Sequence, residues 1–255
     1  MKCYKPFAQG DHRWLVFSQD EHKPGSVVDT NQVAITSGGH AILLDPGGIE
    51  VFPSMIGALV QEVDLDSVSH IFLSHQDPDV GSGLALWRQV TLPGTMVHIS
   101  ALWPSYVAHF DSDTHFSPIP DEGAELTLGG TALRFLPSHY MHSPGAFAVY
   151  DPTARALFSG DIGAAILPGT PIRDIWVTDF NNHVQYMDGF HRRILACREA
   201  RDAWVEMVAG LTLDFIVPQH GLAFRGQDVP RFLDWLSRLE IGSGVGAYRG
   251  RTARK

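Results

Sequence analysis

Residues 74–80, SHQDPDV, follow the apolar run Ile71-Phe72-Leu73 and place one imidazole and two carboxylates, those of His75, Asp77 and Asp79, within five residues. Side chains on a tight loop after a strand can point to one place, and carboxylates that converge there repel each other unless a cation is bound. The stretch therefore predicts a metal site. The alternative is a plain surface turn, because Asp-Pro-Asp is also a good turn sequence.

The chain has 255 residues, of which 44% are hydrophobic and 18% charged, as expected for a globular protein of enzyme size. No linker rich in Pro, Gly or Ser divides it, so we expect one domain over residues 1–241. The end, residues 242–255, is rich in Gly and Arg and is expected to be a flexible tail.

Charge and apolar content exclude several kinds of partner. A net charge of −9 argues against nucleic acid, which would need a basic face. No apolar stretch approaches the roughly 18 residues that cross a bilayer, and no secretory signal opens the chain, so we expect no membrane contact and a cytoplasmic location. Free thiols at Cys3 and Cys197 fit that reducing compartment, and neither cysteine has a metal-ligand spacing.

Short apolar runs bounded by turn residues alternate with helical patterns along the chain. We expect strands at residues 14–17, 32–35, 41–44, 71–73, 95–99, 126–128, 132–136, 146–150, 156–158 and 215–218. Helices are expected at residues 53–63, 83–89, 104–110, 184–208 and 229–239. Many short strands interleaved with helices indicate an α/β fold with two β-sheets between helical layers.

Three further ends of predicted strands or strand-like runs carry residues that can bind metals: His142, Asp161 and His220. Each lies close to a Gly or a Pro, and small neighbours allow the backbone to approach a ligand closely. Loops at strand ends are also where a rigid scaffold presents functional groups. We therefore add these residues to the candidate ligands.

The ordered series His75-x-Asp77-x-Asp79, His142, Asp161 and His220 resembles that of the metallo-β-lactamase-fold superfamily over almost the whole chain. The resemblance implies an αββα sandwich of two mixed sheets with a dinuclear metal site at one edge, in which Asp161 bridges the two metals. It also implies that Asp45 supports the metal loop from behind.

Two positions distinguish branches of this superfamily. Hydrolytic members carry His-x-His-x-Asp-His, whereas this chain has a carboxylate at Asp77 and an apolar residue at Val80. A set of three imidazoles and three carboxylates is harder than an imidazole-rich zinc site and suits iron. The chain thus resembles the diiron branch, the flavodiiron and oxygen-binding diiron proteins, although Asp77 is one methylene shorter than the Glu of that branch.

Carried over to this sequence, the resemblance implies two iron ions with zinc or manganese as alternatives, and no flavin in this chain. One iron would take His75, Asp77, His142 and Asp161, and the other Asp79, Asp161 and His220. Val80 stands where a further histidine is often found, which implies an open position on the second metal. His139 and Tyr140 are candidates for lining the pocket or orienting a ligand.

The expected function is binding of dioxygen, or of another small diatomic molecule, by a sensor or carrier. Reduction of dioxygen would need a separate electron donor, so a redox or signalling protein is an expected partner, and a homodimer is left open. The alternative is a metal-dependent hydrolase of ester or phosphodiester substrates, which the fold favours and the carboxylate of Asp77 opposes. We assign no catalytic residue beyond the metal ligands.

Overall fold

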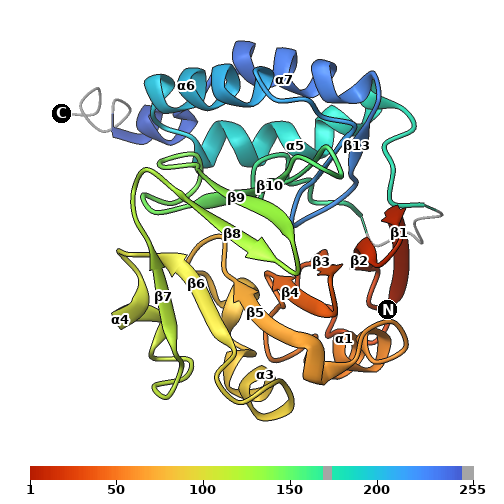
Figure 1. Cartoon of the computed structure of the whole chain (residues 1–255). Coiled ribbons are helices and arrows are strands. Elements are labelled where there is room, and N and C mark those ends of the chain that lie inside the picture. The colour runs from red at the N-terminus through yellow and green to blue at the C-terminus, as the bar shows by residue number, and fades with distance from the viewer. Residues whose placement is uncertain (169–173, 249–255) are drawn as a thin grey trace.

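In the computed structural model, which describes residues 1–168 and 174–248, the chain forms two sheets stacked between helical layers (Figure 1). The seven strands of the first sheet lie in chain order: β1 (Lys2–Gln9), β2 (His12–Ser18), β3 (Gln32–Ser37), β4 (His40–Leu44), β5 (Val68–Phe72), β6 (Met96–Ser100) and β7 (Phe116–Ile119). The strands of the second sheet lie in the order β13 (Phe224–Arg225), β12 (Phe215–Val217), β11 (Ala156–Phe158), β10 (Phe147–Asp151), β9 (Thr131–Pro137) and β8 (Ala124–Leu128). This is the expected αββα architecture.

The helices cover the outer faces of both sheets (Figure 1). Against the first sheet and its connections lie α1 (Phe52–Leu59), α2 (Pro78–Gly81), α3 (Leu84–Val90) and α4 (Pro104–Val107). Over the second sheet lie α5 (Phe180–Ile194), α6 (Arg198–Ala209) and α7 (Asp228–Arg238). None of the described helices is long and apolar enough to cross a membrane.

Three apolar clusters hold these layers together. The central one fills the space between the sheets and includes Trp14, Phe72 and Phe158, all fully buried. The others pack each sheet against its own helices, through Trp87 of α3 on one side and Phe232 of α7 on the other. Burial of such large side chains removes enough apolar area from water to stabilise a single packed unit.

The long helix expected over residues 184–208 is two helices. α5 ends at Ile194, because Leu195 is extended, and α6 begins after Cys197, whose Sγ accepts a hydrogen bond from the Ala200 N–H. No Gly or Pro marks this break, so the apolar periodicity runs through it. The expected helices at residues 53–63 and 104–110 end earlier than predicted, at Leu59 and Val107.

The expected flexible tail lies partly outside the described residues. Gly242 still donates its N–H to the Leu195 carbonyl, and Ser243–Val245 form a short 3-10 helix. A second short 3-10 helix, Leu65–Ser67, precedes β5. Residues 249–255 lie outside the described part, so the division at residue 241 stays a prediction.

Candidate metal centre

The candidate ligands meet because parallel strands of both sheets end at one edge of the sandwich. β4 and β5 are parallel in the first sheet, and β11 and β12 are parallel in the second. The loop after β4 carries Asp45, and the loop after β5 carries residues 75–79. Asp161 lies in the loop after β11, and His220 in the loop after β12. His142 comes from the connection between β9 and β10, where the Phe147 N–H donates to the Ser74 carbonyl and ties that connection to the first loop.

One half of the centre consists of His75, Asp77 and His142, whose ligand atoms lie within 4.8 Å of one another. Asp77 Oδ2 is 3.5 Å from His75 Nε2 and 3.2 Å from His142 Nε2. Both imidazoles lower the pKa of the Asp77 carboxyl. A metal ion among these three groups could bind the carboxylate oxygen and both ring nitrogens, which would make three coordinate bonds.

The other half consists of Asp79 and His220, and Asp161 lies between the two halves. His220 Nε2 is 3.2 Å from Asp79 Oδ2 and 3.4 Å from Asp161 Oδ1, while Asp161 Oδ2 is 3.2 Å from His142 Nδ1. Asp161 thus turns one oxygen toward each half. The resemblance implies that Asp161 is a bridging carboxylate, and that role stays a prediction.

Protonation in this cluster follows from burial and charge. Burial alone would raise the pKa of Asp161, but the neighbouring imidazoles of His220, His75 and His142 outweigh it and lower the pKa to about 2. Burial would lower the pKa of His220, and the carboxylates of Asp161 and Asp79 instead raise it to about 10. The buried carboxylates therefore attract positive charge, which protonated imidazole supplies here and a metal ion would supply in its place.

Two buried atoms show that the cluster fits a metal ion. Asp161 Oδ1 and His142 Nδ1 have no hydrogen-bond partner among the described residues, although each lies near a group of opposite polarity. Leaving buried polar atoms unpaired costs about 1–3 kcal/mol each. Coordination to a metal would satisfy both atoms, and three imidazoles with three carboxylates are a donor set that suits iron.

Asp45 contacts the metal loop at Ser74, and its role as a support of the ligands stays a prediction. Its carboxylate is fully buried and accepts hydrogen bonds from the Ser74 N–H, at 2.7 Å, and from Ser74 Oγ. Ser74 Oγ also lies 2.9 Å from His75 Nδ1, so it links the carboxylate to the ligand ring. Burial raises the pKa of Asp45 to about 7 despite the nearby His75. Asp45 has φ +45°, an uncommon backbone conformation of the kind often found at functional sites.

Several polar contacts that orient the ligands have no signal in the sequence. Ser143 Oγ donates to Gln76 Oε1 at 2.7 Å, and Gln76 Nε2 donates to Asp77 Oδ1 at 2.9 Å. This relay fixes the shorter carboxylate of Asp77 so that its other oxygen faces the imidazoles. On the far side, His220 Nδ1 donates to the Asp29 carbonyl at 2.9 Å, and Gln219 Nε2 donates to Asp79 Oδ2 at 3.3 Å.

The remaining sequence candidates are His139, Tyr140 and Val80. His139 is bonded through Nε2 to the Asp121 carbonyl and packs against Phe147. Tyr140 is 58% exposed and has φ +64°. Val80 is fully buried in the apolar cluster of the first sheet. The ring of Phe190, which sequence reasoning did not place at the centre, stacks on His142 with centroids 6.1 Å apart.

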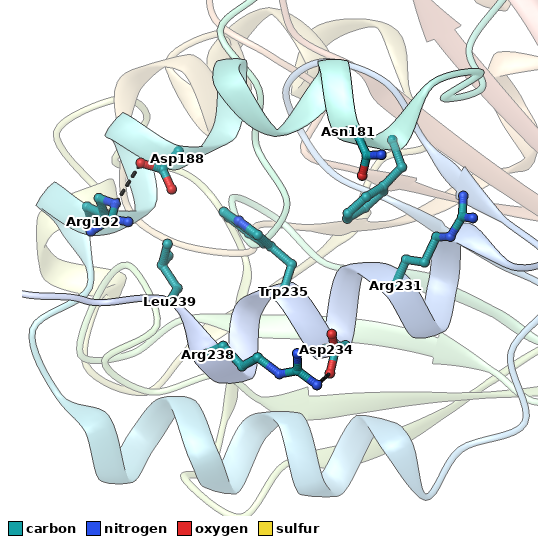
Figure 2. A pocket seen from close by; sticks show the side chains of 9 residues that line it. Asn181, Asp188, Arg192, Arg231, Asp234, Trp235, Arg238 and Leu239 are labelled. Atoms are coloured by element: carbon teal, nitrogen blue, oxygen red, sulfur yellow. Dashed lines mark hydrogen bonds and ion pairs between the residues drawn. The ribbon is translucent and has the colours of Figure 1, made fainter.

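The centre opens to solvent on the side of its two least buried carboxylates. The side chains of Asp77 and Asp79 are 36% and 39% exposed, whereas those of His75 and Asp161 are nearly inaccessible. A separate groove lies between α5 and α7 (Figure 2). Its lining contains none of the six candidate ligands.

A family model described as "ODP family beta lactamase" matches residues 28–221 of the chain. The chain belongs to this family. The match spans the strands and loops that carry all six candidate ligands.

Solved structures agree in fold. A chemotaxis sensor ODP, described as a peroxy diiron species, shares 37% identity and a TM-score of 0.83, over 95% of this chain and 97% of that one. The apo state of chemotaxis sensor ODP from T. denticola also shares 37% identity, with a TM-score of 0.84 over 95% and 96% of the two chains. A flavoprotein from Thermotoga maritima shares 19% identity and a TM-score of 0.77, and the match covers 92% of this chain and 60% of that one.

A curated relative, the putative diflavin flavoprotein A 3 of Synechocystis sp., is 24% identical over 147 residues. The match covers 56% of this chain and 25% of that protein. The chain thus spans about a quarter of the length of this relative, and the activity of the larger protein is not transferred to it by the match.

Proposed function

We propose that this protein is a non-haem diiron protein that binds dioxygen, as a sensor or carrier. The observation that carries the proposal is the carboxylate of Asp77 between His75 and His142, at the position where hydrolytic members of the fold have an imidazole. Membership of the ODP family, and the 37% identity to a chemotaxis sensor that has been seen as a diiron species, support the same conclusion.

In this proposal His75, Asp77, His142 and Asp161 hold one iron, and Asp79, Asp161 and His220 hold the other. A bound iron pair supplies reversible redox chemistry and a binding position for a small diatomic molecule. The chain's own residues fix the donors: Ser74 orients His75, the Asp29 carbonyl orients His220, and Gln76 orients Asp77. Such outer partners set ring orientation and ligand basicity.

The apolar side chain of Val80 leaves the second metal with fewer protein donors than the first, which fits a position for an external ligand. The exposed edges of Asp77 and Asp79 give a path from solvent to that side of the centre. The proposal also places the protein in the cytoplasm, supported by two free cysteines, Cys3 and Cys197. A separate redox or signalling protein would receive or reset its state.

Metal analysis tests the first part of the proposal. The protein is purified from cells grown with iron and zinc, and metal content is measured by elemental analysis. We expect two irons per chain in the native protein and a large loss of both in Asp161→Ala, because one carboxylate serves both halves. Zinc in the native protein, together with hydrolysis of a chromogenic ester or phosphodiester, would contradict the proposal and support a hydrolase.

A further inference from the structure

His191 of α5 is a buried histidine outside the set of metal ligands, and both of its ring nitrogens have partners. Its Nε2 accepts a hydrogen bond from the Gly163 N–H at 3.0 Å, and its Nδ1 lies 2.9 Å from the Met187 carbonyl. A carbonyl can only accept, so the proton is on Nδ1 and the imidazole is neutral. Burial lowers the pKa of His191 to about 4, in agreement with that neutral form.

The partner of this ring belongs to the loop of the bridging carboxylate. Gly163 follows Asp161 by two residues and has φ +99°, a conformation that glycine adopts without strain. Within the loop, the Ala164 N–H donates to the Asp161 carbonyl, and Ser159 Oγ donates to the Ile162 carbonyl. The hydrogen bond from the Gly163 N–H to the His191 ring joins this turn to a side chain of α5.

The ring itself is held firmly in place. His191 is 1% exposed, and the Trp235 ring of α7 meets it edge-on with centroids 5.4 Å apart. Figure 2 shows Trp235 reaching from α7 toward α5, and it is one of the residues that line the groove between these helices. The imidazole therefore presents its acceptor nitrogen to Gly163 at a fixed position.

Phe190, which precedes His191 in α5, contacts the loop that carries His142. Phe190 stacks on His142, with an angle of 16° between the rings. His142 Nδ1 in turn lies 3.2 Å from Asp161 Oδ2. Two consecutive residues of one helix thus contact the two loops that bring His142 and Asp161 together.

We propose that His191 is a positioning residue for the bridging carboxylate: by accepting the Gly163 N–H, it fixes the turn that directs Asp161 between the two metal positions. This inference rests on the proposed function for the identity of the metal. The hydrogen bond and its effect on the loop do not depend on that identity.

Substitutions at His191 separate the hydrogen bond from mere filling of space. His191→Gln keeps an acceptor near the position of Nε2. His191→Asn keeps an amide group near the position of Nδ1 but is too short to reach Gly163. His191→Phe keeps the volume of the ring without an acceptor. His183→Phe is the matched control. His183 lies on the same helix and is 3% exposed, but it packs against Phe224 and Tyr186 rather than against a ligand loop.

Two measurements are made on the full chain. The first is the affinity for Fe(II) and, separately, for Zn(II), by competition with a chromophoric chelator. We expect His191→Asn and His191→Phe to bind either metal about 10–100-fold more weakly, as is typical for loss of a partner behind a metal ligand. His191→Gln is expected to recover most of the affinity, and His183→Phe to match the native protein.

The second measurement is hydrogen exchange of the Gly163 amide in the metal-free protein, by NMR. We expect slow exchange in the native protein and in His191→Gln, and fast exchange in His191→Asn. Native affinity in His191→Asn, no recovery in His191→Gln, or an unprotected Gly163 amide in the native protein would each overturn the inference. If His191→Phe does not fold, the Gln and Asn variants decide. A native protein that prefers zinc would refute the proposed function but leave this test intact.

Discussion

At the scale of the residue, the centre is defined by what stands at position 77. Asp77 supplies one oxygen to two imidazoles and gives its other oxygen to Gln76. A carboxylate here adds negative charge and hardness to a site that already holds Asp79 and Asp161. This is the physical difference between the present centre and an imidazole-rich zinc site.

Changing that residue should change the metal. In Asp77→His, we expect the ratio of zinc to iron to rise when the protein is loaded from a mixture of both, because imidazole favours zinc more than carboxylate does. Elemental analysis after removal of free metal measures the ratio. Asp77→Glu is the control and should keep the iron preference, so an unchanged ratio in Asp77→His would show that position 77 does not select the metal.

Asp45 offers a second test at this scale. Asp45→Asn removes the buried carboxyl group that orients Ser74 and, through it, the ring of His75. We expect metal affinity to fall about 10–100-fold, measured by chelator competition. Asp151→Asn is the matched control: Asp151 is also fully buried, but it binds His12 and Trp14 away from the centre. An equal loss of affinity in both variants would mean that Asp45 acts only through stability.

At the scale of the element, the neighbouring parallel strands β5 and β6 bring together two histidines that are not candidate metal ligands. His70 of β5 and His98 of β6 lie with Nδ1 and Nε2 3.0 Å apart, and His98 is buried against Phe135. Burial lowers the pKa of both rings. The neighbouring imidazole of His40 lowers the pKa of His70 further, and that of His70 adds to the effect of burial on His98, whose pKa falls to about 4.

This pair should make the metal-free protein sensitive to acid. Between about pH 6.5 and 4 the unfolded chain binds a proton at His98 that the folded chain does not, so the free energy of unfolding falls as pH falls. Between pH 7.5 and 5.0, the free energy of unfolding should fall less in His98→Phe than in the native protein. We expect the two decreases to differ by up to about 2 kcal/mol. Urea unfolding at both pH values measures this, and parallel losses in the two proteins would contradict the assignment.

The elements also show where sequence reasoning ends. Strands with buried apolar runs, such as β4, were predicted from residue pattern, whereas β1 and β7 each contain a Pro and lie at the edges of their sheet, where the apolar pattern is weak. The break between α5 and α6 has a cysteine cap in place of a Gly or Pro signal. Local pattern could not reveal either feature, because packing decides both.

At the scale of the whole molecule, the six candidate ligands, from four loops, meet because both sheets end at one edge. Residue type and position at strand ends made them candidates, the family resemblance completed the set, and their role as ligands stays a prediction. The groups that orient them were not predicted: the Asp29 carbonyl is a backbone atom, and His191 lies on a helix that is distant in sequence from Gly163. Such contacts arise from the fold and have no spacing to recognise.

The central proposal for this chain is that it binds dioxygen at an iron pair. The most direct measurement is the optical spectrum of the iron-loaded protein after reduction without air, recorded before and after oxygen is added and again after oxygen is removed. We expect an absorption band that appears with oxygen and reverses on its removal, with two irons per chain throughout. A spectrum that does not respond to oxygen, or a site that retains zinc in place of iron, would contradict this account.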